Sequence, residues 1–267
     1  MKTNLPNSYN PASRVCTGDT GVIELFRVED SYGLLRVTQR GDKRILSFGS
    51  GLEQSSMYMN KRHYLSHEYT KIMLLGFLFT DAKNISILGL GGGGLAHCLL
   101  HYFPQCKINV VELRQLVIDI AHDWFELPKK DSLKIYCIDA YDYLQSQNRE
   151  STDLIMSDLY VADGMSQVQA QVSFIESSYK VLNEQGCLVV NFHHLPEADS
   201  LLMQKIHGLF NTVFICDVFK GNKVIFCCKR TEKIALSELK LKVKALVKIV
   251  EIPLMYYVKQ LKTFEKI

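Results

Sequence analysis

The stretch Ile85-Ser-Ile-Leu-Gly-Leu-Gly-Gly-Gly-Gly-Leu-Ala-His-Cys-Leu-Leu100 decides the fold. Its apolar start ends abruptly in glycines, and a helical pattern resumes at Leu95. This order predicts a buried parallel strand, a tight turn and a helix N-terminus. Gly89, Gly91 and Gly93 form a GxGxG spacing. Such a turn lets the backbone approach a ligand closely, and the helix N–H groups favour an electron-rich group. Glycine-rich turns also occur for structural reasons alone.

Length and composition narrow the classes of protein to consider. The 267 residues suffice for a large domain with a small appendage, and a net charge of +3 is too small to indicate a nucleic-acid partner. The longest apolar run, residues 72–79, is far shorter than the roughly 20 residues that span a bilayer. The start of the chain is polar and lacks the apolar core of a secretory signal.

The eight cysteines include no CxxC pair. Cys98, Cys137, Cys187 and Cys216 lie in apolar contexts, which favours buried thiols over disulfides or a metal site. We therefore expect a cytoplasmic protein that has no metal ion, no membrane span and no nucleic-acid partner.

The chain divides into four predicted segments. Residues 1–20 read as a polar arm, and residues 21–60 contain short β-prone runs that predict a small antiparallel sheet. In residues 61–230 strands and helices alternate, which predicts parallel strands with right-handed crossovers. Residues 231–267 predict a lysine-rich amphipathic helix that Pro253 breaks or kinks. Its lysine face reads as a solvated surface, with a partner, membrane-surface or RNA contact as the alternative.

The alternation ends in two β-prone runs, residues 212–219 and 223–228, with three residues between them. No helix fits there, so an antiparallel hairpin is expected. We predict an α/β fold with a class I methyltransferase-like, Rossmann-type sheet of seven strands, preceded by the small antiparallel sheet. A helix over residues 64–79 should pack against the larger sheet.

Acidic residues follow the predicted strands, where a nucleoside lies in folds of this kind. Glu112 ends the second strand, and a carboxylate there can bind both ribose hydroxyls, although a surface acid is the alternative. Asp139 and Ala140 follow the third strand. Asp139 can accept the adenine amine beside a small neighbour, or cap the next helix, or both.

Asp158 ends the fourth strand, and the loop after it carries Tyr160 and Asp163. The loop is long enough to form a lid, and these side chains would face the reacting end of the ligand. A carboxylate at Asp158 could bind a substrate amine or remove its proton before the amine attacks. Asp163 and Gly164 can equally form only a turn.

The order of these motifs resembles the spermidine synthase family of polyamine aminopropyltransferases, and more closely the bacterial spermidine synthase-like proteins. The motifs are the glycine loop, Val110-Val-Glu-Leu, Ile138-Asp-Ala, Ser157-Asp-Leu-Tyr and Gly221-Asn222. The resemblance covers about residues 20–230.

The resemblance implies that an adenosyl-sulfonium donor, decarboxylated S-adenosylmethionine, lies against Gly89, Gly91 and Gly93. It implies ribose binding by Glu112, adenine binding by Asp139 with Ala140, and nucleoside contact by Gln54. It places the catalytic groups at Asp158 and Tyr160 and implies substrate binding by the remaining set of His67, Glu68 and Asp163.

Three departures from the family pattern concern charge. The glycine loop lacks the family's aspartate, and only His67-Glu68 remains of its Asp-Glu-x-x-Tyr-His-Glu segment. The family's Asp-x-x-Asp becomes Asp158-Leu-Tyr-Val161, without a second carboxylate unless Asp163 replaces it. Arg62 stands where an anion is expected, and it could pair with the carboxylate of intact S-adenosylmethionine.

We therefore expect an enzyme of polyamine biosynthesis that transfers an aminopropyl group to an amine such as putrescine, with a homodimer as the candidate assembly. The first alternative is an S-adenosylmethionine-dependent methyltransferase. The second is a nucleoside-binding module that has lost turnover. A nicotinamide dehydrogenase is disfavoured by the terminal hairpin.

Overall fold

The computed structural model describes residues 15–17, 21–49, 52–161, 164–219, 221–231 and 236–264. The N-terminal part forms an antiparallel sheet of five strands in sequence order. The strands are β1 (Val15–Thr17), β2 (Val22–Asp30), β3 (Gly33–Arg40), β4 (Lys43–Phe48) and β5 (Leu52–Tyr58). This confirms the expected small sheet, and β1 adds a short strand from the predicted polar arm.

The larger sheet has eight strands in the order β15-β13-β14-β12-β9-β6-β7-β8. The strands are β6 (Asn84–Leu88), β7 (Lys107–Glu112), β8 (Leu133–Cys137), β9 (Thr152–Ser157), β12 (Leu182–Phe192), β13 (Thr212–Asp217), β14 (Lys223–Cys228) and β15 (Lys262–Thr263). Strands β6, β7, β8, β9 and β12 run parallel, and β14 pairs antiparallel with both β12 and β13. The predicted methyltransferase-like Rossmann sheet with a closing hairpin is confirmed.

The C-terminal helix is broken before Pro253, one of the two outcomes that we predicted, and it is followed by a strand that we did not predict. The segment forms helix α7 (Leu236–Ile249), helix α8 (Leu254–Val258) and the edge strand β15. Pro253 stands at the N-cap of α8, where its missing N–H removes no helical bond. The chain then returns to β13, which gives the sheet an eighth strand that its hydrophobic pattern did not reveal.

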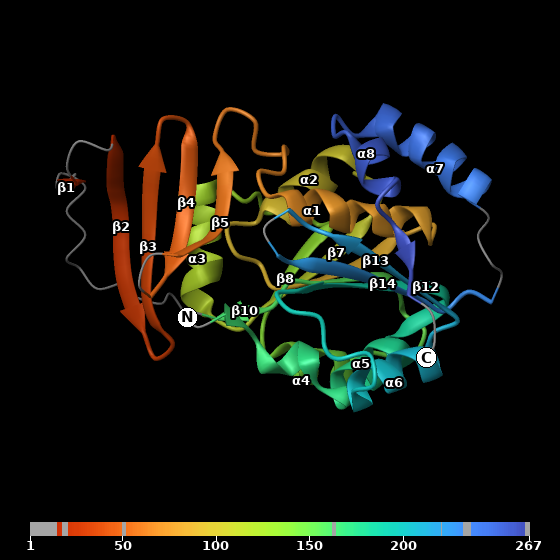
Figure 1. The fold of residues 1–267 in the computed structure, drawn as a ribbon. Coiled ribbons are helices and arrows are strands. Elements are labelled where there is room, and N and C mark those ends of the chain that lie inside the picture. Colours follow the sequence, from red (N-terminus) through yellow and green to blue (C-terminus); the bar gives the residue numbers. More distant parts are fainter. Residues whose placement is uncertain are drawn as a thin grey trace.

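Helices cover both faces of the larger sheet (Figure 1). One face carries α1 (Glu68–Met73), α2 (Gly94–Tyr102), α7 and α8, and the other carries α4 (Ala140–Ser146), α5 (Val172–Val181) and α6 (Leu201–Leu209). The helix predicted from residue 64 begins only at Glu68, because Leu65 still bridges to Met57 of the small sheet. After Met73 it tightens into a 3-10 helix, Leu74–Leu78.

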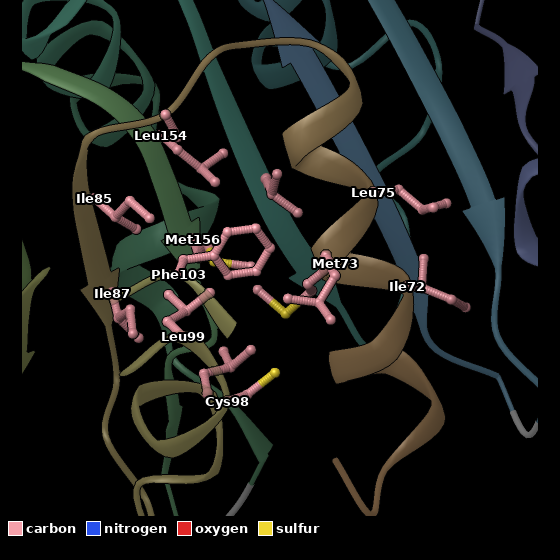
Figure 2. Close-up of a cluster of buried hydrophobic side chains, with 14 of the residues drawn as sticks. Ile72, Met73, Leu75, Ile85, Ile87, Cys98, Leu99, Phe103, Leu154 and Met156 are labelled. Carbon is pink, nitrogen blue, oxygen red and sulfur yellow. The ribbon is translucent and has the colours of Figure 1, made fainter. Parts of the chain in front are cut away.

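The core between α1, α2 and the sheet is built from buried aliphatic, aromatic and sulfur-containing side chains. Figure 2 shows side chains of α1 and α2 converging on those of β6 and β9. The labelled members are Ile72, Met73, Leu75, Ile85, Ile87, Cys98, Leu99, Phe103, Leu154 and Met156. This packing fixes α1 and α2 beside the carboxyl ends of the central strands.

Most of the cysteines in the described ranges are buried free thiols, as expected. Cys137 is the exception and is exposed, so its predicted burial is wrong. It ends β8, the edge strand, where an apolar sequence context does not guarantee cover. Cys227 and Cys228 join hydrophobic clusters on opposite faces of the sheet. Within the described ranges, none of the helices combines the length and apolar character needed to cross a membrane.

The small sheet docks on helix α3 (Gln115–Phe125) through apolar side chains of both elements. Beside this contact, the buried Arg114 guanidinium donates to Asp30 Oδ1 at 2.7 Å and to Asp30 Oδ2 at 3.1 Å. It also donates to the Gly33 carbonyl at 2.8 Å. This ion pair therefore joins the small sheet to the larger domain.

Replacing Asp30 by alanine is expected to destabilise the protein by about 2–3 kcal/mol, because a buried guanidinium would lose its counter-charge. The value lies below that for a fully buried pair, since Asp30 keeps some solvent contact. Urea unfolding would measure the change. Asp42→Ala, at an exposed turn, is the matched control and should change the free energy of unfolding by no more than about 0.5 kcal/mol. Equal effects of the two substitutions would contradict the role of the ion pair.

Candidate functional site

A cleft of about 1180 Å³ opens over the carboxyl ends of the parallel strands and reaches β5 and α1. It lies above β6, from which the chain proceeds to β7 and β8 on one side and to β9 and β12 on the other. Ligands of open α/β sheets bind at such a switch point. Two short strands, β10 (Tyr160–Val161) and β11 (Gly164–Met165), form a hairpin at the cleft.

The glycine loop is held tightly at the floor of the cleft. Gly89 has φ of +96°, and a Cβ added there would lie 2.3 Å from the Asp158 carbonyl oxygen. A Cβ at Gly91 would lie 3.1 Å from Cβ of Ser55. The Gly92 N–H donates to Ser55 Oγ at 3.0 Å. Gly93, with φ of +79°, caps α2 behind the loop, so it shapes the turn.

The Glu112 carboxylate is held by two backbone amides. Its Oε2 accepts from the Leu90 N–H at 3.1 Å, and its Oε1 accepts from the Arg114 N–H at 3.0 Å. Burial raises the pKa of Glu112, while these amides and the Arg114 charge oppose the rise. Glu112 lines the cleft and is partly buried, so it is no ordinary surface acid.

Asp139 caps helix α4, which is one of the roles predicted for it. Its Oδ1 accepts from the Tyr141 N–H at 2.7 Å and from the Asp142 N–H at 3.4 Å. Because both bonds use Oδ1, capping leaves Oδ2 available for a second role. Asp139 and Ala140 both line the cleft, next to Ile138.

Asp158 belongs to a polar network at the centre of the cleft. Its Oδ1 accepts from Asn191 Nδ2 at 2.9 Å, and the Tyr69 hydroxyl also donates to its carboxylate. Asn222 Nδ2 in turn donates to Asn191 Oδ1 at 3.1 Å and to the Tyr160 hydroxyl at 3.3 Å. Burial raises the pKa of Asp158, while Asn191 and Tyr69 oppose the rise. Burial also raises the pKa of Tyr160, next to the Asp158 charge.

Tyr69 and Asn191 were missed as site residues by the sequence analysis. A signal was present for each. Asn191 is a polar residue directly after the apolar run Cys187-Leu-Val-Val190 of β12, and Tyr69 directly follows His67-Glu68. Asn191 becomes informative once the strand order brings β12 beside β9, and Tyr69 once α1 packs against β12.

The side chains assigned to substrate binding lie on the α1 side of the cleft. His67 Nε2 lies 3.2 Å from Ser56 Oγ and 3.6 Å from Glu53 Oε1. Burial lowers the pKa of His67, and the Glu53 charge opposes this. Glu68 Oε2 accepts from the Phe219 N–H at 3.0 Å. Gln54 also lines the cleft, whereas Asp163 lies outside the described residues.

Arg62 does not lie in this cleft, which contradicts its suggested pairing with a donor carboxylate. Its Nη1 contacts Glu126 Oε2 at 2.9 Å and donates to the Met59 carbonyl at 3.0 Å. It lines a separate cleft further along α2. The segment before α1 forms turns, with hydrogen bonds from the Lys61 N–H to the Tyr58 carbonyl and from the Tyr64 N–H to the Lys61 carbonyl.

The main cleft is lined by acidic side chains. Among the described residues that line it, five carry carboxylates and none is lysine or arginine. The five are Glu53, Glu68, Glu112, Asp139 and Asp158. Lys43, outside the lining, already pairs with Glu53 at 2.8 Å. The lining as a whole still favours a cationic ligand, because a bound positive charge meets net negative charge there. In the part of the chain that the structure describes, no three His, Cys, Asp or Glu side chains gather closely enough to hold a metal ion.

The strand order, the closing hairpin and the cleft at the switch point define a methyltransferase-like Rossmann protein with a small N-terminal sheet. Residues 67–227 match the model of the spermine/spermidine synthase domain. The chain therefore belongs to this family, as its motifs predicted.

Relatives of two activities share this similarity. The chain is 30% identical over 185 residues to an eEF1A lysine and N-terminal methyltransferase of Danio rerio, covering 61% of this chain and 26% of that protein. It is 30% identical over 159 residues to a polyamine aminopropyltransferase of Neisseria meningitidis, covering 58% of this chain and 60% of that protein. The structure resembles that of a probable spermidine synthase from Corynebacterium glutamicum with a TM-score of 0.72, 21% identity and 90% coverage of both chains.

Proposed function

We propose that this transferase binds decarboxylated S-adenosylmethionine and transfers its aminopropyl group to an amine, as in polyamine biosynthesis. The observation that carries the proposal is the charge of the cleft, lined by five carboxylates and, among the described residues, by no lysine or arginine. The sulfonium donor and an amine acceptor are both cations. Intact S-adenosylmethionine adds a carboxylate, which would lie in this cleft without a cationic partner.

The donor's nucleoside would lie at the glycine-loop end of the cleft. Gly89 and Gly91 line this end of the cleft, where the nucleoside would lie against the loop. The preoriented Glu112 carboxylate would accept from the ribose hydroxyls, and Oδ2 of Asp139 would accept from the adenine amine. Gln54 would contact the nucleoside from the small sheet.

The transfer step would take place beside Asp158. Its carboxylate accepts a proton from the acceptor ammonium, and the freed nitrogen lone pair attacks the carbon next to the sulfonium. The new C–N bond forms as the C–S bond breaks. The electron pair of the C–S bond stays on the sulfur, which becomes neutral, and methylthioadenosine leaves. Tyr160 flanks the reacting groups, and His67, Glu68 and Asp163 would hold the acceptor. Holding both reactants in line supplies much of the rate.

Methyl transfer from S-adenosylmethionine is the second candidate function. Two observations favour it: the methyltransferase relative, and the absence of a second carboxylate in Asp158-Leu-Tyr-Val161. A binding module without turnover would share the nucleoside site but form no product.

Calorimetry with decarboxylated and intact S-adenosylmethionine distinguishes these functions. The decarboxylated donor is expected to bind at least about tenfold more tightly, because it brings no anion into the cleft. Incubation with putrescine should then give spermidine and methylthioadenosine in equal amounts by mass spectrometry. Tighter binding of the intact donor together with a methylated product would favour the methyltransferase. Binding without product from a panel of amines would favour the module.

A further inference from the structure

A second cleft, of about 360 Å³, lies further along α2 than the main cleft. Gly94 and Leu95 of this helix line the main cleft, whereas His97 and His101 line the second. The walls of the second cleft also come from the segment after β5 and the segment after α3. The two clefts are therefore separate sites that share one helix.

The charge of the second cleft is opposite to that of the main cleft. Its charged and titratable lining residues are Arg62, His63, His97, His101 and Lys130, and no carboxylate is among the described residues that line it. Arginine and lysine side chains bring positive charge to the cleft. The histidines add positive charge when they are protonated.

Two of the histidine rings are stacked, so an anion beside them would stabilise their protonated forms. The rings of His63 and His101 stack with centroids 3.9 Å apart and planes 13° apart. Burial, His101 and Lys61 lower the pKa of His63, and Glu251 opposes them. Two stacked imidazolium ions would repel each other unless a counter-ion lay beside them.

The neighbouring groups do not cancel this preference. His97 Nε2 lies 3.0 Å from the Phe125 carbonyl, which fixes its ring in the wall. Glu126 lies 2.9 Å from Nη1 of Arg62, which also donates to the Met59 carbonyl, and a guanidinium carries five N–H donors. Glu251 pairs with Lys61 at 2.9 Å, and its charge also acts on His63 and His101. The ring of Tyr102 stands edge-on to both imidazole rings. The charges nearest the histidines are therefore two ion pairs, and Lys130 adds an exposed cation at the rim.

We propose that this second cleft binds a phosphate-type anion, held by Arg62, Lys130 and the stacked pair of His63 and His101. Planar guanidinium and imidazolium donors suit the oxygens of such an anion. This site goes beyond the proposed transfer reaction and does not depend on it. The chemistry fits both inorganic phosphates and phosphate esters.

Calorimetry with pyrophosphate at pH 6.5 and low salt tests the site on the full chain. Lys130→Ala is expected to weaken binding at least fivefold. Lys129→Ala, an exposed neighbour outside the cleft lining, is the matched control and should leave binding unchanged. Absence of binding, or equal weakening by both substitutions, would overturn the proposal. Inorganic phosphate and ribose 5-phosphate as further probes distinguish a free anion from an ester.

Protonation of the histidines gives a second readout of the same site. Sulfate keeps its charge between pH 6 and 8, so any change in its affinity there reports on the protein. Sulfate binding is expected to strengthen several-fold from pH 8 to pH 6, and His101→Gln should reduce this dependence. Binding that is independent of pH in the unmodified protein would contradict the role of the histidines.

Discussion

Asp158→Asn is expected to lower the rate of aminopropyl transfer by about 10²–10⁴-fold, the usual contribution of a positioned proton acceptor. The amide can still accept a hydrogen bond from Asn191, so the geometry of the site should survive. It cannot take up the proton of an acceptor ammonium. Single-turnover kinetics with a saturating donor would measure the change, and calorimetry should show donor binding altered by only a few-fold.

Asp142→Asn is the matched control for this substitution. Asp142 is an exposed acid in the first turn of α4 and lies outside the cleft lining. It should leave the transfer rate unchanged. An unchanged rate in Asp158→Asn would exclude proton transfer to this carboxylate. Equal losses of rate and of donor binding would instead indicate that Asp158 anchors the donor.

The order of elements was predictable because local patterns determine it. The apolar run from Ile85 into four glycines, and two β-prone runs too close together for a helix between them, each allow few structures. Glu112, Asp139 and Asp158 were found for the same reason. Each lies at or just past the carboxyl end of a parallel strand, and these ends meet at one edge of the sheet.

The remaining features depend on packing between distant segments. Tyr69 reaches Asp158 because α1 packs against the sheet beside β12, which no local pattern encodes. Arg62 was misplaced because Leu65 still pairs with β5, so the helix starts later than its periodicity indicates. The motif indicated which residue types lie in the segment before α1, but it did not indicate where the helix begins.

Gly89→Ala is expected to destabilise the protein by about 4 kcal/mol or more and to abolish detectable donor binding. The added Cβ would lie 2.3 Å from a backbone oxygen, that of Asp158, and φ at this position is +96°. Neither segment can yield easily. The Gly89 N–H is bonded to the Val111 carbonyl and the Asp158 N–H to the Leu88 carbonyl, both at 2.8 Å. Urea unfolding and calorimetry would measure the two effects.

Two further glycine substitutions distinguish the effect of the steric clash from the effect of replacing a glycine where no clash occurs. Gly208→Ala in α6 meets no atom within 4 Å and should stabilise the protein by up to about 1 kcal/mol. Gly91→Ala would press on the Ser55 side chain, which can shift, so it should cost less stability than Gly89→Ala but still weaken donor binding. Because the Gly89 clash involves the backbone of Asp158, a folded Gly89→Ala protein should lose transfer as well as binding. Retention of both would show that the glycine loop and the reactive carboxylate are not mechanically coupled.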